Sequence, residues 1–568
     1  MPYQGTSPYI LAENNLTNVQ LIDDISSQFN GNTTTFTLTS SGDAFHTVAA
    51  RAIFVVLGGI VQNPGTDYTT SGGQITFTTA PQSGISFAGR KIYGLNQQEG
   101  VNDGTITPAK LNSGAPSWDI YGNLSLADNY SSGELSSIKI KTTTPETKPN
   151  LDLNFERNKR LDNKINCSRS SIATYVGPDG LIKTVQPNKP RFDHDPVTRE
   201  SLGLLIEESR TNQMINSSDI TGATAQNGTI TGNATTAPDG TTTADQYAAN
   251  STNSIHRVDV PFTSGQISNS TAYTFSVFVK ANGYDKLHIR YAGYNADNHG
   301  RGYDLSDGST FDGKFDGTGA LGAVTSSSMI EYPNGWYKCS FTFTTASDAA
   351  SGVANILYYV SNSEATTNFA GDGSSGMYFW GAQMEAGSFP TSYIPTSGST
   401  VTRSGDNLDI PYNEFYNDSL TYDYASTFYA EAKVFKANQT NMIVEGYIGS
   451  SLRDFSLNTM NGAKMQYVHR YTTTNSYDND TANNTVTDNV FFKTAMSYTG
   501  TNGGLHGTIN GRNPVLGEDD LGSTGAGGDT MAIGRRGSNN TLYLNGHLKR
   551  LIYYPAKFTS NQLINLTK

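Results

Sequence analysis

Short runs of alternating polar and apolar residues dominate this chain. Alternation with a period of two is typical of β-strands that have one buried and one solvated face. The clearest run is Ala272–Lys280, in which Phe275 and Val277 fall on one face of the predicted strand. Thr274 and Ser276 fall on the other face, which we expect to be solvated. Such strands are expected to pack as pairs of sheets in β-sandwiches.

The first part of the chain shows the same pattern on a smaller scale. Turn residues fill 63–68, with the sequence NPGTDY, and 71–73, with the sequence SGG. Gly, Pro, Asn and Asp at these places favour tight connections between antiparallel strands. We therefore predict a small antiparallel β domain, with strands at 36–39, 51–60, 74–77 and 85–87.

Residues 376–410 form the joint around which the chain is organised. The segment opens with a predicted strand, Met377–Trp380, whose bulky side chains suit a half-buried pleated surface. Pro390 and Pro395 then interrupt regular structure, because proline lacks a backbone donor and restricts the residue before it. We expect the last strand of one sandwich to lead here into the first strand of the next.

The composition supports an all-β protein with several domains. The 568 residues exceed the size of a single hydrophobic core. There are 58 glycines and 32 tyrosines but only 15% charged residues, which favours strands and turns over helices. The net charge of -12 argues against binding of duplex nucleic acid, which needs a clustered basic surface. Solubility is the simpler explanation of this charge.

The cysteines and the start of the chain exclude two further classes. Cys167 and Cys339 are the only cysteines, so no disulfide framework or cysteine metal site is expected. Residues 1–6, MPYQGT, do not begin a secretory signal, and no run of 18 apolar residues occurs. We expect neither secretory export nor a membrane span. Release by cell lysis within a virus particle would reconcile this with an extracellular-looking composition.

The N-terminal region resembles a known family of virion proteins. Residues 54–84, FVVLGGIVQNPGTDYTTSGGQITFTTAPQSG, resemble the tail-attachment domain of fibres from short-tailed, T7-like phages, in particular phages of aquatic bacteria such as cyanobacteria. The segment Asp103–Leu111, DGTITPAKL, is similar to one that recurs just after such domains. The resemblance implies that residues 1–110 bind phage tail proteins of the adaptor or nozzle.

Residues 151–216 are the most charged part of the chain and resemble a junction segment of phage tail proteins. The similar stretches are Ser168–Val176, Gly177–Ile182 and Pro190–Pro196, followed by Gly203–Asn212. We expect a folded collar that buries salt bridges between subunits.

Two segments resemble sandwich families that bind sugars. The segment 217–397, with Tyr332–Tyr337, resembles jelly-roll carbohydrate-binding modules of phage and bacterial surface proteins. The segment 398–568, with Tyr543–Tyr554, resembles concanavalin-like, laminin-G-type lectin sandwiches. That family often ends with a short helix after a segment like Phe558–Ile564.

These observations predict a small N-terminal antiparallel β domain, a connector or collar, and then two tandem jelly-roll β-sandwiches. The expected boundaries are a tail-attachment domain at 1–110, a connector at 111–150, a charged junction or collar at 151–216, a carbohydrate-binding-module-like sandwich at 217–397 and a concanavalin-like or laminin-G-like sandwich at 398–568. Trp336 and Trp380 are expected in the core, because they occupy runs that resemble the family's buried strands.

No enzyme signature is present, and we expect no catalytic residues and no enzyme. Residues 317–322, GTGALG, fit the dinucleotide pattern GxGxxG, but no helical pattern follows them. No nucleophile elbow, zinc-protease helix or phosphate-binding loop occurs. No cofactor is therefore expected, apart from the calcium alternative that follows.

Acidic residues gather in two places. Asp307, Asp312 and Asp316 lie close together in a glycine-rich stretch, and residues 518–520 are all acidic. Oxygen-rich clusters of this kind suit calcium, and paired carboxylates can hydrolyse glycans. Solvated turns, in which Asp makes local hydrogen bonds, explain the same residues. A calcium ion at Asp307, Asp312 and Asp316 remains the alternative.

Two stretches have the mixture of aromatic and polar side chains that a sugar site needs. An ordinary strand whose tyrosines cover the sheet would look the same. The candidates are Arg290, Tyr291, Tyr294 and His299 in the first stretch, and Tyr447, Arg453, His469, Arg470 and Tyr471 in the second.

The hypothesis that unites these features is a virion protein, a phage tail fibre for host adsorption. It would attach to the tail through residues 1–110, bind host-surface glycan through its C-terminal sandwiches and, like the fibres it resembles, assemble as a homotrimer. Several weak sites on three chains would add avidity. The alternatives are a tail-borne polysaccharide depolymerase and a purely structural tail or decoration protein.

Overall fold

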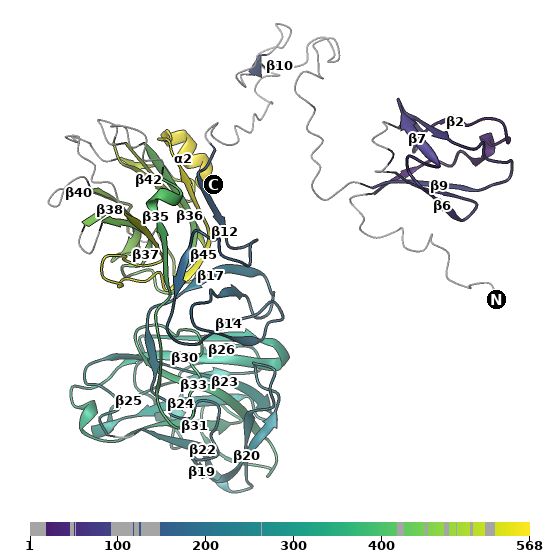
Figure 1. Cartoon of the computed structure of the whole chain (residues 1–568). Coiled ribbons are helices and arrows are strands. Elements are labelled where there is room, and N and C mark those ends of the chain that lie inside the picture. The colour runs from purple at the N-terminus through teal and green to yellow at the C-terminus, as the bar shows by residue number, and fades with distance from the viewer. Residues whose placement is uncertain are drawn as a thin grey trace, which may run out of the picture. The chain divides into compact units, whose positions relative to one another are not determined.

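The chain folds into two compact units, residues 1–141 and residues 142–568. The structure is a computed structural model that describes residues 19–45, 50, 53–92, 117–118, 124–125, 148–262, 264–416, 425–448, 452–470, 476–483, 485–499, 504–516 and 529–568. The described strands pair antiparallel in several sheets, which confirms the predicted all-β fold (Figure 1).

The N-terminal unit is built from two small sheets around an aromatic core. Phe29 packs edge-on against Phe36, with 5.1 Å between ring centroids, and both side chains are buried. The predicted antiparallel β domain is thus confirmed within the described residues. One sheet has the order β1 (Val19–Ile22), β9 (Phe87–Ile92), β5 (Ile53–Leu57), β6 (Ile60–Gln62), and the other has the order β2 (Thr35–Thr37), β8 (Gln74–Phe77), β7 (Tyr68–Ser71).

The predicted connector contains one described hairpin. It pairs β10 (Ser117–Trp118) with β11 (Leu124–Ser125). The remainder of 111–147, and the segment Asp103–Leu111, lie outside the described residues.

The middle sandwich packs two sheets face to face around a core of Phe, Tyr, Val and Ile side chains. The first sheet has the order β19 (Thr224–Gln226), β22 (Asn253–Phe262), β31 (Ala354–Ser361), β24 (Lys286–Ala292), β25 (Asn298–Asp304), β26 (Ser309–Phe311). The second has the order β20 (Gly228–Thr235), β21 (Ala244–Ala249), β33 (Gly376–Ala386), β23 (Ala272–Asn282), β30 (Trp336–Thr344), β29 (Ser326–Tyr332).

The outer face of strand β23 is covered, which corrects one prediction. Thr274 and Ser276 were expected in solvent, but both are buried. The chain that leaves β33 runs back past Thr274, whose hydroxyl donates to the Gly387 carbonyl oxygen at 2.9 Å. Alternation therefore gave the two faces correctly, but it did not show that a later segment covers the second face.

The C-terminal sandwich has more strands than the middle one. It includes strands that precede the middle sandwich in the sequence as well as strands that follow it. Its first sheet has the order β16 (Phe192–His194), β17 (Ser201–Ile206), β45 (Gly546–Tyr554), β36 (Ser426–Val434), β41 (Phe492–Tyr498), β42 (His506–Ile509), β43 (Val515–Leu516), and β12 (Leu151–Asn154) also pairs with β45. Its second sheet has the order β13 (Asn166–Ser168), β35 (Asn407–Pro411), β44 (Thr530–Ile533), β37 (Met442–Ile448), β38 (Leu452–Met460), β39 (Lys464–Arg470), β40 (Ser476–Asp480).

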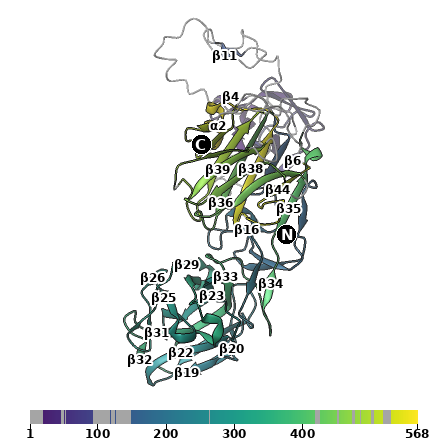
Figure 2. The same cartoon turned by 90° about the vertical axis from the view of Figure 1, so that its left-hand side faces the viewer.

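The two sandwiches are therefore not simply tandem. Strands β12, β13, β16 and β17 belong to the segment 151–216, which the sequence suggested was a separate collar. They complete both sheets of the C-terminal sandwich, so the middle sandwich is an insertion within it. Figures 1 and 2 show the two sandwiches end to end, with the 151–216 segment running through their junction.

A hairpin from the same segment covers the middle sandwich. It pairs β14 (Ala173–Val176) with β15 (Ile182–Val185). Val176 and Ile182 join an apolar cluster with Phe278, Trp336 and Trp380. Both tryptophans are thus buried, as predicted, although they lie in this cluster at the junction and not in the core cluster between the two sheets.

A network of buried charges holds the junction together within one chain. The Arg191 guanidinium donates to Glu207 Oε2 at 2.7 Å and also contacts Asp406, and all three side chains are almost completely buried. Arg169 reaches Asp406 at 2.8 Å. Salt bridges were expected in this segment, but between subunits; these bridges join parts of one chain.

The chain ends in the helix α2 (Ser560–Thr567), which confirms the short terminal helix that the resemblance implied. Thr559 caps it, because its hydroxyl accepts from the Gln562 backbone N–H while the Gln562 side chain accepts from the Thr559 N–H. Leu563 anchors the helix in a small cluster with Phe558. None of the helices among the described residues is long and apolar enough to cross a membrane.

Candidate functional site

The outer face of the first sheet of the middle sandwich carries the polar and aromatic cluster that best fits a binding site. Arg257 on β22 lies opposite Tyr359 on β31, and Arg290 on β24 lies opposite Leu357 in the next row. Because side chains alternate across a strand, Arg257, Tyr359 and Arg290 all point away from the core. The neighbouring strand β25 has Gly300 opposite Arg290, and the Leu321 side chain lies close over this glycine, 2.9 Å from where a Cβ would stand.

A loop that contains β27 (Lys314–Phe315) and β28 (Gly319–Ala320) lies over this face. The Phe315 ring packs on the Arg290 guanidinium, with 4.1 Å from Cζ to the ring centroid. The loop lies close to the sheet, because a Cβ added at Gly313, just before β27, would lie 2.9 Å from the Gly302 backbone nitrogen. The loop thus brings an aromatic ring and an acidic side chain onto the two arginines.

Asp316 is the centre of the cluster. Its Oδ1 accepts from Arg257 Nη1 at 2.8 Å and from the Tyr359 hydroxyl at 3.0 Å. Its Oδ2 lies 3.5 Å from Arg290 Nη1. The Asp316 side chain is 48% exposed, whereas those of Arg257 and Arg290 are 15% and 17% exposed. The result is a half-open polar site that offers a carboxylate and two guanidinium groups to a ligand.

Hydrogen bonds hold the two arginines in place. Arg257 also pairs with Asp259 at 2.8 Å, and the Arg290 Nε–H donates to Asn298 Oδ1 at 2.7 Å. Burial lowers the pKa of Arg257, but its bonds to Asp259 outweigh burial and raise that pKa above the ordinary value. Both guanidinium groups are therefore held in fixed positions for recognition of a ligand.

His288 stands beside this cluster on β24 and is completely buried. Its Nε2–H donates to the Ser363 carbonyl oxygen at 3.0 Å, and its Nδ1 accepts from the Lys314 backbone N–H at 3.0 Å. Burial lowers the pKa of His288 to about 4. The neutral imidazole thus anchors the loop that carries Phe315 and Asp316.

Tyr291 is a predicted glycan contact that the structure corrects. Its side chain is buried, and its ring lies 4.5 Å from that of Phe343 in the core. The Tyr291 hydroxyl has no hydrogen-bond partner among the described residues, and burial raises its pKa. A ring enclosed in this way has no face free for a sugar. Neighbouring side chains on β24 point to opposite faces, so Tyr291 lies inside while Arg290 lies outside.

Tyr294 and His299 lie at the end of β24 and the start of β25. Tyr294 is 38% exposed in the short turn η5 (Tyr294–Ala296), against Gly352. His299 Nε2 bonds to Asp297 at 2.9 Å, and its ring stacks on Phe343 at 5.0 Å. Of the four candidates in this stretch, only Arg290 belongs to the Asp316 cluster.

The second predicted stretch is described only in part. Tyr447 on β37 lies opposite Arg453 on β38, and Phe455 lies opposite His469 on β39. The Tyr447 ring is half-buried against Gly537, and its hydroxyl donates to Asp409 at 3.4 Å. Nothing is described of the side chains of Arg453, His469 and Arg470, and Tyr471 lies outside the described residues.

The predicted calcium ligands each have a different partner. Asp307 accepts from the Ser309 backbone N–H at 2.9 Å, and Asp312 pairs with Arg301 at 2.6 Å. Asp316 belongs to the arginine cluster. In the part of the chain that the structure describes, no group of three or more His, Cys, Asp or Glu side chains is placed to hold a metal. Residues 518–520 lie outside that part.

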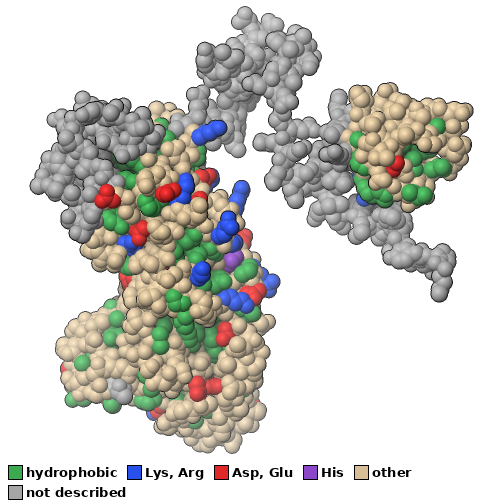
Figure 3. All heavy atoms as spheres, viewed as in Figure 1, with side chains coloured by type: hydrophobic (Ala, Val, Ile, Leu, Met, Phe, Trp, Pro, Cys, Tyr) green, Lys and Arg blue, Asp and Glu red, His purple; other side chains and the backbone are tan. Residues whose placement is uncertain are grey.

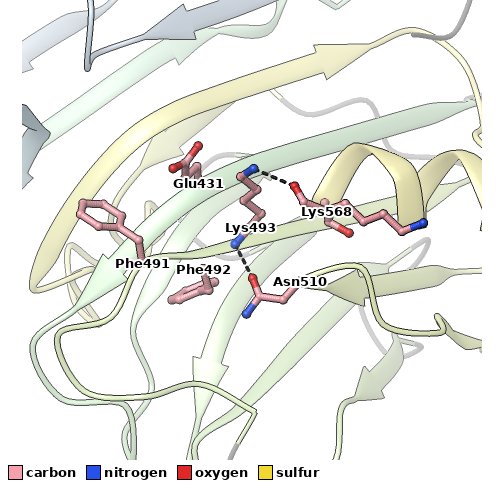
Figure 4. Close-up of a pocket in the computed structure, with 7 residues that line it drawn as sticks. Glu431, Phe491, Phe492, Lys493, Asn510 and Lys568 are labelled. Atoms are coloured by element: carbon pink, nitrogen blue, oxygen red, sulfur yellow. Dashed lines mark hydrogen bonds between the residues drawn. The ribbon is translucent and has the colours of Figure 1, made fainter. Parts of the chain in front are cut away.

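A shallow pocket of about 220 Å³ beside α2 is a different kind of site (Figure 4). Phe491, Phe492 and Glu431 line it together with Lys493. The Lys493 ammonium donates to the Lys568 carbonyl oxygen at 2.7 Å, and the Lys493 backbone N–H donates to Asn510 at 2.9 Å. These bonds engage Lys493, Asn510 and the Lys568 carbonyl group within the protein.

Arg257, Tyr359 and Phe315 are site residues that the sequence reasoning missed. The signal for two of them was the period-two alternation of Asn253–Phe262 and Ala354–Ser361, which puts Arg257 and Tyr359 on outward positions. Nothing in the sequence indicated that Phe315 would fold back onto Arg290.

No protein-family model and no curated protein sequence matches this chain. Among solved structures, the chain is similar to the carbohydrate-binding module of family 40 from Ruminococcus gnavus IT-sialidase, bound to α2,3-sialyllactose. That match has 17% identity and a TM-score of 0.24, and covers 26% of this chain and 83% of the module.

Two further structures show the same limited similarity. The receptor-binding domain of botulinum neurotoxin D matches with 15% identity and a TM-score of 0.23, over 28% of this chain and 41% of that one. A leech intramolecular trans-sialidase matches with 17% identity and a TM-score of 0.23, over 25% of this chain and 23% of the enzyme.

Proposed function

We propose that this chain is a receptor-binding tail fibre protein of a short-tailed phage, located in the virion tail. The N-terminal unit attaches the protein to phage tail proteins of the adaptor or nozzle. The middle sandwich binds a glycan on the host surface. Three copies form the fibre, so that weak sites act together.

The observation that carries glycan binding is the Asp316 cluster. A sugar needs donors and acceptors in fixed positions for its hydroxyl groups, beside an apolar surface for its ring. Arg257, Arg290 and Asp316 supply the polar groups, and Phe315 supplies the aromatic ring. Asp316 is half exposed, so the cluster is open to a ligand at that point.

The attachment role is supported by the outer face of the N-terminal sheet. Leu21 and Phe54 both lie opposite Arg90, and their side chains are 57% and 42% exposed. Val61, opposite Val56 on the same sheet, is 53% exposed. Several large apolar side chains exposed on one face of a sheet are typical of protein-binding surfaces.

The full-length protein on a glycan array and on intact bacterial cells tests this proposal. Release of reducing sugar from the polysaccharide of the same cells is measured in parallel. Saturable binding without sugar release is the expected result. Sugar release would identify a depolymerase, and absence of binding to every glycan and cell type would favour a structural role.

A further inference from the structure

A cavity of about 380 Å³ lies where the two sandwiches and the 151–216 segment meet. All three parts of the chain line it, and the volume falls within the usual range for small-molecule sites, about 300–1,000 Å³. Its walls are mainly apolar and include Phe278, Ile330 and Phe389 from the middle sandwich and Phe435 from the C-terminal one.

Lys338 is the unusual residue in this lining. Its side chain is 8% exposed, and its ammonium donates to the Thr391 carbonyl oxygen at 2.8 Å. The Phe278 ring lies beside it, 5.9 Å from Nζ to the ring centroid. An ammonium carries three donors, and Thr391 is the one acceptor that the described residues supply.

No described carboxylate forms an ion pair with Lys338. Burial lowers the pKa of Lys338, and the more distant charges of Glu385, Glu207 and Asp193 offset this only in part. A buried lysine without a paired anion is costly for the folded protein. An anionic ligand in the cavity would supply the missing partner.

The acidic groups around the cavity are already engaged. Asp193 accepts from the Val176 backbone N–H at 2.6 Å and bonds to His547 Nε2 at 2.8 Å. Glu207 accepts from Arg191 and from the Ser392 hydroxyl at 2.6 Å. Asp195 accepts from two backbone N–H groups of its own loop. These bonds direct the carboxylates to other partners and leave Lys338 unpaired.

A second lysine, Lys433 of the C-terminal sandwich, also lines the cavity. Burial lowers its pKa, and the Phe491 ring lies 5.1 Å from its Nζ. Two lysines and an apolar wall fit a molecule with one charged end and an apolar body. An inorganic anion would leave the aromatic walls without a contact.

We propose that this cavity binds a small organic carboxylate, whose anionic group pairs with Lys338 and whose apolar body packs against Phe278 and Phe389. The site is separate from the Asp316 cluster and does not depend on glycan binding there. Because both sandwiches line the cavity, an occupant stabilises their junction.

The test uses the full-length protein and four probes: benzoate, cyclohexanecarboxylate, the uncharged benzamide and inorganic phosphate. Isothermal titration calorimetry is expected to show saturable binding of the two carboxylates and at least tenfold weaker binding of benzamide and phosphate. Lys338→Met, which keeps the apolar stem, is expected to weaken benzoate binding at least tenfold. Lys280→Met, on the adjacent strand but outside the cavity lining, is the matched control and retains binding.

Failure of the intact protein to bind either carboxylate would overturn the proposal, as would equal binding of phosphate and benzoate. Unchanged benzoate affinity in Lys338→Met would do the same. If Lys338→Met does not fold, Ile330→Trp carries the test, because Ile330 is 44% exposed at the cavity and a larger side chain there occludes it. Unchanged benzoate binding by the Ile330→Trp protein would contradict the proposed site.

Discussion

Leu205 on β17 pairs with His547 on β45, although the whole middle sandwich lies between them in the sequence. Cys167 on β13 likewise pairs with Leu408 on β35 in the other sheet. Both sheets of the C-terminal sandwich therefore need strands that precede the inserted middle sandwich in the sequence. This arrangement couples the folding of the segment 151–216 to that of the chain end.

A fragment comparison checks this coupling. Residues 398–568 alone are expected to be insoluble or to lack a cooperative thermal transition, because they leave the edges of β35 and β45 unpaired. Residues 148–568 contain all of these strands and are expected to unfold cooperatively. Circular dichroism on both fragments makes the comparison. A soluble monomer of 398–568 with a sharp melting transition would contradict the account.

The buried charges at the junction predict a large loss of stability on substitution. Burial raises the pKa of Glu207, but the charges of Arg403 and Arg191 outweigh burial and hold that pKa below its usual range. Glu207→Gln leaves these guanidinium groups short of a counter-charge, and we expect a loss of about 3–5 kcal/mol in the free energy of unfolding.

Chemical denaturation of the full-length protein measures this loss. Lys183→Met is the control, because Lys183 forms an exposed ion pair with Asp179 at 2.7 Å. Loss of this exposed ion pair should lower the free energy of unfolding by no more than about 1 kcal/mol. Equal effects of the two substitutions would show that the buried network does not stabilise the junction.

His288 predicts a pH dependence for the middle sandwich. Its pKa falls from 6.5 to about 4 on folding, so the unfolded chain binds a proton more readily than the folded one. The contribution of neutral His288 is complete above pH 6.5 and is lost as the pH falls toward 4, by about 1.4 kcal/mol per pH unit. In the folded protein Nδ1 accepts a hydrogen bond from the Lys314 backbone N–H. A protonated Nδ1 would lose this bond and would face another donor.

Denaturation midpoints at pH 7 and pH 4.5 test this, for the intact protein and for His288→Gln. The variant is less stable at pH 7, but its stability should fall less on acidification. A parallel fall in both proteins would assign the acid sensitivity to other groups.

Much of the fold follows from local pattern, whereas the site depends on distant parts of the chain. Alternation predicted β23 and showed that Arg290 and Tyr291 must point to opposite faces, but it could not show which of them is buried. That choice depends on Phe343, a partner far along the sequence. Local pattern likewise could not predict the insertion of one sandwich into the other. Nothing in the sequence around Leu205 or His547 indicates that their strands pair.

The acidic residues show the same limit. A cluster of aspartates in a glycine-rich stretch has the composition of a cation site, although solvated turns explain the same residues, and nothing in the sequence indicated that one of them would pair with arginines. Folding places Asp316 between Arg257 and Arg290, whereas Asp312 pairs with Arg301. Sequence proximity therefore grouped residues that the fold separates.

The most direct measurement of the central claim is adsorption of the full-length Arg290→Met protein to bacterial cells that the intact protein binds. Arg550→Met is the matched control, since Arg550 forms an ion pair with Asp152 on the other sandwich. If the Asp316 cluster holds the glycan, Arg290→Met weakens adsorption at least tenfold, while Arg550→Met adsorbs like the intact protein. Undiminished adsorption of a folded Arg290→Met protein would contradict the account.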